Sequence, residues 1–194
     1  QGGLAAVRRG ECDIAGVHLC DPATGEYNRP FVTPDMQLIS GYGRQQCVVY
    51  RSGDSRFENR SLFEILKQVT SDSTCQMINR NPGSGTRLLI DELLGRILPR
   101  DQLTSVPGYR LQTKSHNAVA AAVSQGRADW GVAIDVVARQ YGLAAIPIRE
   151  ERYDFIAPQL RLQTPAVRCF VELLSDSRIR TKLEHLGFAV IPSG

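Results

Sequence analysis

The feature that most constrains the fold is a short pattern that occurs twice in the chain. Residues 4–17 read LAAVRRGECDIAGV and residues 120–132 read AAAVSQGRADWGV. Each copy has a helix of small residues, a glycine suited to the left-handed end of that helix, an aspartate three positions later and an apolar strand. The glycine and aspartate pairs are Gly10 and Asp13, and Gly126 and Asp129. The repeat predicts two similar lobes that bind a ligand between them, although such a module also recurs by chance in α/β proteins.

The rest of the chain alternates between strand-like and helix-like segments, which favours an α/β fold with parallel sheets. Ser61 and Glu64 form a capping box, so a helix is expected from there to about Val69. Thr164 followed by Pro165 predicts the start of another helix. Strands are expected at 14–19, 36–40, 47–50, 75–79, 130–134 and 144–148, and further helices at 4–9, 85–98 and 119–124, with a last one ending near Gly187.

Residues 79–94, NRNPGSGTRLLIDELL, form the most informative loop and helix. The loop follows a predicted strand, so its amides include the unpaired first donors of the next helix, where the helix dipole favours negative charge. Two glycines allow close backbone approach, and two arginines can bind an oxyanion or carboxylate. The predicted anion site consists of Arg80, Gly83, Ser84, Gly85, Thr86 and Arg87. The simpler alternative is that Ser84 only caps the helix and both arginines are solvated.

Composition narrows the class of protein. The chain has 194 residues and a net charge of +3, with its basic residues scattered, so no nucleic-acid contact is expected. No segment approaches the ~20 apolar residues of a membrane span. Five cysteines without a C-x-x-C pair indicate a reducing compartment, and we expect a cytoplasmic location. Because Gln1 is not Met and helix-like residues follow at once, we expect that an upstream segment precedes this chain.

Several segments in the right order resemble a known family. These are residues 10–19, 44–46, 79–87, 115–120 and 126–129. Together they resemble the periplasmic-binding-protein-like domain that is fused to helix-turn-helix regulators or to molybdopterin-biosynthesis proteins, and that is similar to type 2 receptors for molybdate and tungstate. The resemblance implies a two-lobed α/β fold without catalysis, each lobe a small, mainly parallel sheet flanked by helices, with the first strand missing from this chain. We expect lobe I at 1–45 and 136–194, and lobe II at 46–135.

The resemblance also implies which histidines join the site. His18 ends a predicted strand and would face the ligand from lobe I, since ligands in open sheets lie at the carboxyl ends of strands. Taken alone, a single histidine at such a position is more often a hydrogen-bonded core residue. His116 precedes a helix and is a second ligand candidate or a cap residue. Asp135 is expected at a hinge or in a surface turn.

Catalytic alternatives fit the sequence poorly. A serine hydrolase needs Gly-x-Ser-x-Gly, and Pro82 stands where the first glycine belongs. Cys12, His18 and Cys20 do not have a zinc-site spacing. No dinucleotide motif follows a strand. Glu150 and Glu151 are interpreted as solvated carboxylates rather than an acid/base pair. No enzyme activity, cofactor or metal is therefore expected.

The sequence thus favours a ligand-sensing domain that closes on a small anion, such as molybdate or tungstate, and signals to a fused DNA-binding or molybdopterin-biosynthesis domain upstream. The alternatives are an accessory domain of a molybdenum-cofactor biosynthesis protein and the solute-binding receptor of an oxyanion ABC transporter. A homodimer is compatible with each of these functions. No membrane contact is expected.

Overall fold

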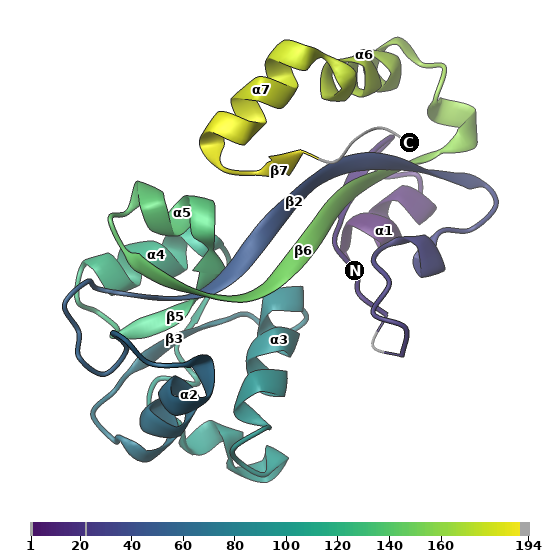
Figure 1. The fold of residues 1–194 in the computed structure, drawn as a ribbon. Helices are drawn as coiled ribbons and strands as arrows, with labels where there is room; N and C mark the ends of the chain where they lie inside the picture. Colours follow the sequence, from purple (N-terminus) through teal and green to yellow (C-terminus); the bar gives the residue numbers. More distant parts are fainter. Residues whose placement is uncertain (1, 22, 191–194) are drawn as a thin grey trace. The chain divides into compact units, whose positions relative to one another are not determined.

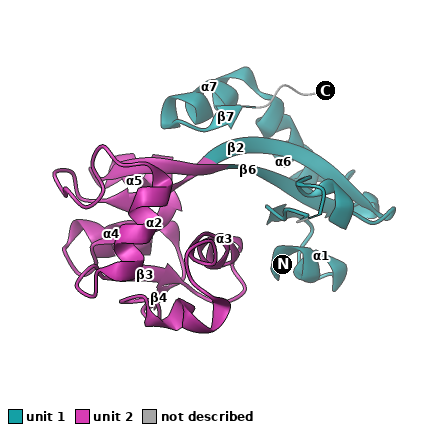
Figure 2. Cartoon of the chain, turned by 60° about the horizontal axis from the view of Figure 1, so that its bottom comes forward, with its two compact units in different colours: residues 1–44, 150–194 teal, residues 45–149 magenta. Residues whose placement is uncertain are grey.

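The computed structural model describes residues 2–21 and 23–190 and divides the chain into two compact units. Unit 1 consists of residues 1–44 and 150–194, and unit 2 of residues 45–149 (Figure 2). The chain passes between them twice, inside the strands β2 (Met36–Tyr50) and β6 (Ala144–Pro158). The predicted lobe boundaries lay between residues 45 and 46 and between 135 and 136, whereas the unit boundaries lie between 44 and 45 and between 149 and 150.

Unit 2 contains a mixed sheet with helices on both faces. Its strand β3 (Met77–Arg80) pairs in parallel with β4 (Gln112–Thr113) and with β5 (Trp130–Ile134). The final residues of β2 pair antiparallel with β5, in the register Gln46↔Ile134. The helices of this unit are α2 (Leu62–Ser71), α3 (Gly85–Leu94), α4 (His116–Ser124) and α5 (Asp135–Gln140), with the 3₁₀ segment η2 (Arg100–Ser105).

Alternation along the strands of unit 2 separates two apolar faces, and Figure 1 shows α2 and α3 on one side and α4 and α5 on the other. The face under α2 and α3 forms one large cluster, and its strand residues are Val48, Tyr50, Met77, Trp130 and Val132. Helix residues such as Ile65 and Leu94 are fully buried against it. Each such side chain contributes about 1.5–3 kcal/mol of burial free energy, so this cluster contributes strongly to the stability of the unit.

The opposite face of unit 2 brings α4 unusually close to the sheet. A Cβ on Gly131 would lie 2.6 Å from Cγ1 of Val119 on α4 and 2.9 Å from the carbonyl oxygen of Ile78 on β3. Only glycine fits this contact without movement of the backbone. Gly131 on β5 therefore sets how closely the helix packs.

Unit 1 is built on antiparallel pairs. The strand β1 (Ala15–Val17) pairs with β6, and β7 (Ala189–Val190) pairs with β2. The helices are α1 (Gly2–Arg8), α6 (Pro165–Ser175) and α7 (Ser177–Leu186), with the 3₁₀ segments η1 (Arg29–Phe31) and η3 (Gln159–Arg161). The expectation of a mainly parallel sheet was wrong for these pairs. The directions of β2 and β6 are set by the two places where the chain passes between the units, and not by helix crossovers.

Two apolar clusters stabilise unit 1. Leu4 and Val7 of α1 pack with Val17 and Ile156 of the strands, while Val167 of α6 packs against the other cluster. Helix α7 has no buried residue. Unit 1 therefore has a smaller core than unit 2.

Several element predictions were correct and others were not. The capping box of Ser61 and Glu64 is present, and α6 begins at Pro165. The repeated glycines end their helices with φ angles of 72° at Gly10 and 70° at Gly126. Short strands expected at 36–40 and 47–50 form one strand, the strand expected at 144–148 extends to Pro158, and α3 ends at Leu94.

Candidate functional site

The sheet edge of unit 2 where its parallel strands end collects the candidate residues. β3 and β4 are in register at their last residues, Arg80 and Thr113, and each leads into a helix. The antiparallel partner of β5 places Gln46 opposite Ile134 at the end of that strand. The first turns of α3 and α4 therefore lie at one edge, where open α/β sheets bind ligands.

The first turn of α3 carries hydrogen-bond donors that the protein itself leaves available. Ser84 caps the helix, since its hydroxyl accepts from the amide of Arg87 at 3.2 Å and donates to the carbonyl of Asn81 at 3.0 Å. The amides of Gly85 and Thr86 donate to no acceptor among the residues that the structure describes. Gly83 has a φ of 81°, in the left-handed region. The sequence therefore supplies both a side-chain cap and unpaired amides at this helix end.

Arg80 links the first turns of the two helices. Its guanidinium lies 3.3 Å from Nδ1 of His116, the first residue of α4, and donates to the carbonyl of Lys114 at 3.2 Å. Ser115 caps α4 by accepting from the amide of Ala118. The structure thus brings Arg80 and His116 together, and the arginine adds a positive charge at the same edge.

Arg87 has an internal role at this edge. Its Nε donates to Asp91 at 2.9 Å, and its NH1 donates to the carbonyl of Arg80 at 3.2 Å. The guanidinium also lies 4.3 Å from the ring centroid of Tyr109, whose hydroxyl donates to the same Asp91. Through these contacts Arg87 fixes the position of the loop, and its guanidinium also adds positive charge there.

Thr86, Asp135 and Cys47 each have internal partners in unit 2. Thr86 is only 2% exposed, and its hydroxyl accepts from Nε2 of Gln46 at 3.2 Å. Asp135 begins α5 and accepts from Arg139 at 3.0 Å, so it lies in a helix and not in a surface turn, and its alternative placement at a hinge stays a prediction. Burial, reinforced by Asp135, raises the pKa of the Cys47 thiol to about 12, which leaves it without nucleophilic character at neutral pH.

His18 lies in unit 1, where its Nδ1 is 2.7 Å from Oε1 of Glu151. Arg44 donates to the other carboxylate oxygen at 2.6 Å. Burial alone would raise the pKa of Glu151, but the His18 hydrogen bond and the Arg44 charge outweigh it and hold the pKa at about 2. Glu151 is only 7% exposed, so its interpretation as a solvated carboxylate was wrong.

Aromatic rings surround this ion pair within unit 1. Tyr153 stacks between His18 and Tyr42 at centroid distances of 5.6 and 5.5 Å, and Arg44 lies 4.6 Å from its ring centroid. Glu151, Tyr153 and Tyr42 were not predicted as members of this group. Alternation along β6 was the available signal for Glu151 and Tyr153, but the strand was expected to end at residue 148, and Tyr42 falls between the two strands expected at 36–40 and 47–50.

The candidate residues therefore fall into two sets. Unit 2 brings together Arg80, Gly83, Ser84, Gly85, Thr86, Arg87 and His116, and unit 1 holds His18. Within residues 2–21 and 23–190, His, Cys, Asp and Glu side chains form no group of three that could hold a metal ion. Over the same residues, every helix is too short or too polar to cross a lipid bilayer.

Comparison with known proteins now defines the class. The model of the PBP superfamily domain matches residues 1–175, and the chain belongs to this superfamily of periplasmic-binding-protein-like domains. It is 31% identical over 191 residues to YvgK of Bacillus subtilis, which is described as uncharacterized; the match covers 95% of this chain and 58% of YvgK. The chain thus spans little more than half the length of that relative. An uncharacterized protein from the 5′ region of the 2Fe-2S ferredoxin gene of Clostridium pasteurianum is 29% identical over 101 residues, covering 52% of this chain and 88% of that protein.

Solved structures agree with this class at the level of the fold. A Clostridium perfringens protein, described provisionally as a phosphate ABC transporter substrate-binding protein with bound phosphate, has a TM-score of 0.73 at 10% identity, covering 98% of this chain and 84% of that one. A reduced form of OxyR from N. meningitidis has a TM-score of 0.63 at 16% identity, covering 97% and 80%. The expected fold class, two-lobed α/β of the periplasmic-binding-protein type, is confirmed. The chain is a ligand-binding domain of this superfamily.

Proposed function

We propose that this domain binds a small oxyanion at the sheet edge of unit 2, in the first turn of α3, and that it acts as a non-catalytic sensor. The observation that supports this most directly is the pair of amides of Gly85 and Thr86, which have no internal acceptor in the described part of the chain. Unpaired amides at a helix start, with the dipole behind them, favour an anion.

The neighbouring groups favour a tetrahedral oxyanion within the anion class. Arg80, the last residue of β3, supplies positive charge at the same sheet edge, and its contact with His116 holds it there. Molybdate, tungstate and phosphate all present several acceptor oxygens to such a set of donors. The phosphate bound by the C. perfringens protein of the same fold supports this class without choosing among its members.

The sensor role rests on two further observations. YvgK extends well beyond the matched region, which supports the proposal that a domain of this kind works with another in one chain, such as a DNA-binding or molybdopterin-biosynthesis domain. All five cysteines are free, which supports a cytoplasmic location. The second candidate function is an oxyanion transport receptor, favoured by the shared fold of the phosphate receptor from Vibrio cholerae.

A single-donor deletion tests the binding site. Proline is tolerated at the first position of a helix, and Ser84 already has the extended conformation, with ψ of 144°, that a following proline requires. The Gly85→Pro substitution therefore removes one amide donor with little change in the helix. We expect calorimetric titration with molybdate, tungstate and phosphate to show binding that this variant weakens about 10- to 100-fold, the effect of one hydrogen bond to a charged group.

The matched control is Ser177→Pro. Ser177 is the first residue of α7, and its neighbour Asp176 is also extended, with ψ of 124°. This variant should bind like the wild type. Equal affinity of Gly85→Pro and the wild type for every oxyanion that binds would contradict the proposed site.

A further inference from the structure

Unit 1 contains a cavity of about 570 Å³ that lies outside the site proposed above. Its lining comes from the segment around η1, the start of β2 and the second half of β6. The volume is in the range of small-molecule sites. Because every lining residue belongs to unit 1, the cavity is a property of that unit alone.

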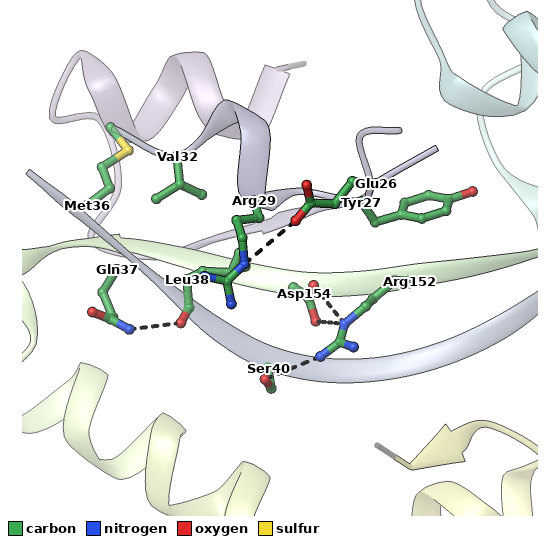
Figure 3. Close-up of a pocket in the computed structure, with 10 residues that line it drawn as sticks. All are labelled: Glu26, Tyr27, Arg29, Val32, Met36, Gln37, Leu38, Ser40, Arg152 and Asp154. Carbon is green, nitrogen blue, oxygen red and sulfur yellow. Dashed lines mark hydrogen bonds and ion pairs between the residues drawn. The ribbon is translucent and has the colours of Figure 1, made fainter. Parts of the chain in front are cut away.

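The lining divides into an apolar end and a polar end. Figure 3 shows Met36 and Val32 at one end, with Leu38 nearby, and Arg152 toward the other end. Met36 belongs to the apolar cluster of unit 1, and Val32 and Leu38 pack against it. One end of the cavity is therefore an extension of the core surface, suited to a short hydrocarbon group.

At the polar end, the carboxylate of Asp154 already accepts hydrogen bonds from within the protein. Asp154 is 1% exposed, and its carboxylate accepts from Asn28, from the amide of Gly41 and from Nε of Arg152. A carboxylate with this many donors has little capacity for another. A ligand donor would find no strong acceptor there.

The basic groups at the same end keep donors available. Arg152 donates through Nε to Asp154 and through NH2 to Ser40, and its NH1 has no acceptor in the described part of the chain. Among the residues that the structure describes, the Arg29 side chain makes only a long ion pair with Glu26, 3.7 Å between Nε and Oε1, and it is 80% exposed. Such an exposed pair is worth little, so a ligand carboxylate can replace Glu26.

We propose that this cavity binds a small carboxylate that carries a short apolar tail, with the carboxylate between Arg29 and Arg152 and the tail against Val32, Met36 and Leu38. The bidentate geometry of guanidinium and carboxylate provides the orientation, and the apolar end provides the preference for a tail. The inference goes beyond the proposed oxyanion function, because it uses different residues and a different ligand class.

Calorimetric titration of the full chain with hexanoate tests the cavity, with acetate and 1-hexanol as matched probes that lack the tail or the charge. We expect hexanoate to bind at least about tenfold more tightly than either matched probe. Acetate lacks the contacts of the apolar tail, and 1-hexanol lacks the hydrogen bonds of the carboxylate to the arginines. Absence of hexanoate binding at millimolar concentration, or equal binding of acetate, would overturn the proposal.

Variants separate this cavity from the oxyanion site. Arg29→Gln should weaken hexanoate binding by about fivefold or more, whereas Arg100→Gln, an exposed arginine of unit 2, should leave it unchanged. Gly85→Pro should also leave it unchanged. Loss of hexanoate binding in Gly85→Pro would assign the carboxylate to α3, and undiminished binding in Arg29→Gln would contradict the cavity site. Oxyanion titrations on the same proteins report on the proposed function separately.

Discussion

The guanidinium of Arg44 donates a hydrogen bond to the buried carboxylate of Glu151, with Nε and Oε2 2.6 Å apart. His18 shares the other carboxylate oxygen, and the ring of Tyr153 lies under the guanidinium. A buried carboxylate of this kind is stable only while its partners remain, so the group is a sensitive point of unit 1.

Replacement of Glu151 by Gln should lower the stability of unit 1 by roughly 3 kcal/mol, because Arg44 would remain buried without its countercharge. Urea-induced unfolding followed by fluorescence or circular dichroism measures the change. Glu150→Gln is the matched control, since the side chain of Glu150 is exposed whereas that of Glu151 is buried. A loss of less than about 0.5 kcal/mol in Glu151→Gln, as for an ordinary surface substitution, would contradict this account.

The same carboxylate should make stability depend on acid pH. Its pKa is about 2 in the folded protein, below the ordinary value of 4.5, so the folded state binds the proton less readily than the unfolded state. The resulting stabilisation is fully present above pH 4.5 and is lost as the pH falls toward 2, on the order of 3 kcal/mol in total. Unfolding free energies measured across this window should fall less steeply in Glu151→Gln. Parallel curves for the two proteins would show that the carboxylate has no such role.

Arg87→Ala should destabilise unit 2 by about 2 kcal/mol, because it removes the ion pair with Asp91, the bond to the Arg80 carbonyl and the contact with Tyr109. Thermal unfolding gives the change. Arg96→Ala, which removes an exposed pair with Glu92, should change stability by no more than about 0.5 kcal/mol. Equal losses of stability in the two variants would show that the internal contacts of Arg87 do not stabilise unit 2.

Gly131→Ala should cost about 1–3 kcal/mol, because the new methyl group would overlap Val119 and the Ile78 carbonyl. Gly2→Ala is the control, since nothing lies within 4 Å of a Cβ at that position. Differential scanning calorimetry should show a lower unfolding temperature only for the first variant. An unchanged temperature for Gly131→Ala would mean that α4 can move away from the sheet at little cost.

Local patterns in the sequence predicted the features that depend on neighbouring residues. Ser61 with Glu64, and Gly10 and Gly126 at helix ends, each determine a local conformation through one or two hydrogen bonds or a φ angle. Ser84 at the start of α3 belongs to the same class. These interactions span only a few residues, so a single sequence contains the information needed to identify them.

Features that depend on distant residues were not predicted. The partners of Glu151 lie at His18 and Arg44, far away in the chain, and nothing near position 151 indicates them. The same holds for the contact of Arg87 with Tyr109. The antiparallel pairing in unit 1 depends on where the chain leaves and re-enters the unit, which local periodicity does not encode.

The most direct test of the oxyanion site is a titration of the ¹⁵N-labelled chain with molybdate or phosphate, observed through its amide resonances. We expect the largest shifts at the amides of Gly85 and Thr86, because they become hydrogen-bond donors to the anion. Smaller shifts should follow at His116 and its neighbours in the first turn of α4. Saturable binding with unshifted Gly85 and Thr86 amides would contradict the central claim, as would a complete absence of binding by any oxyanion tested.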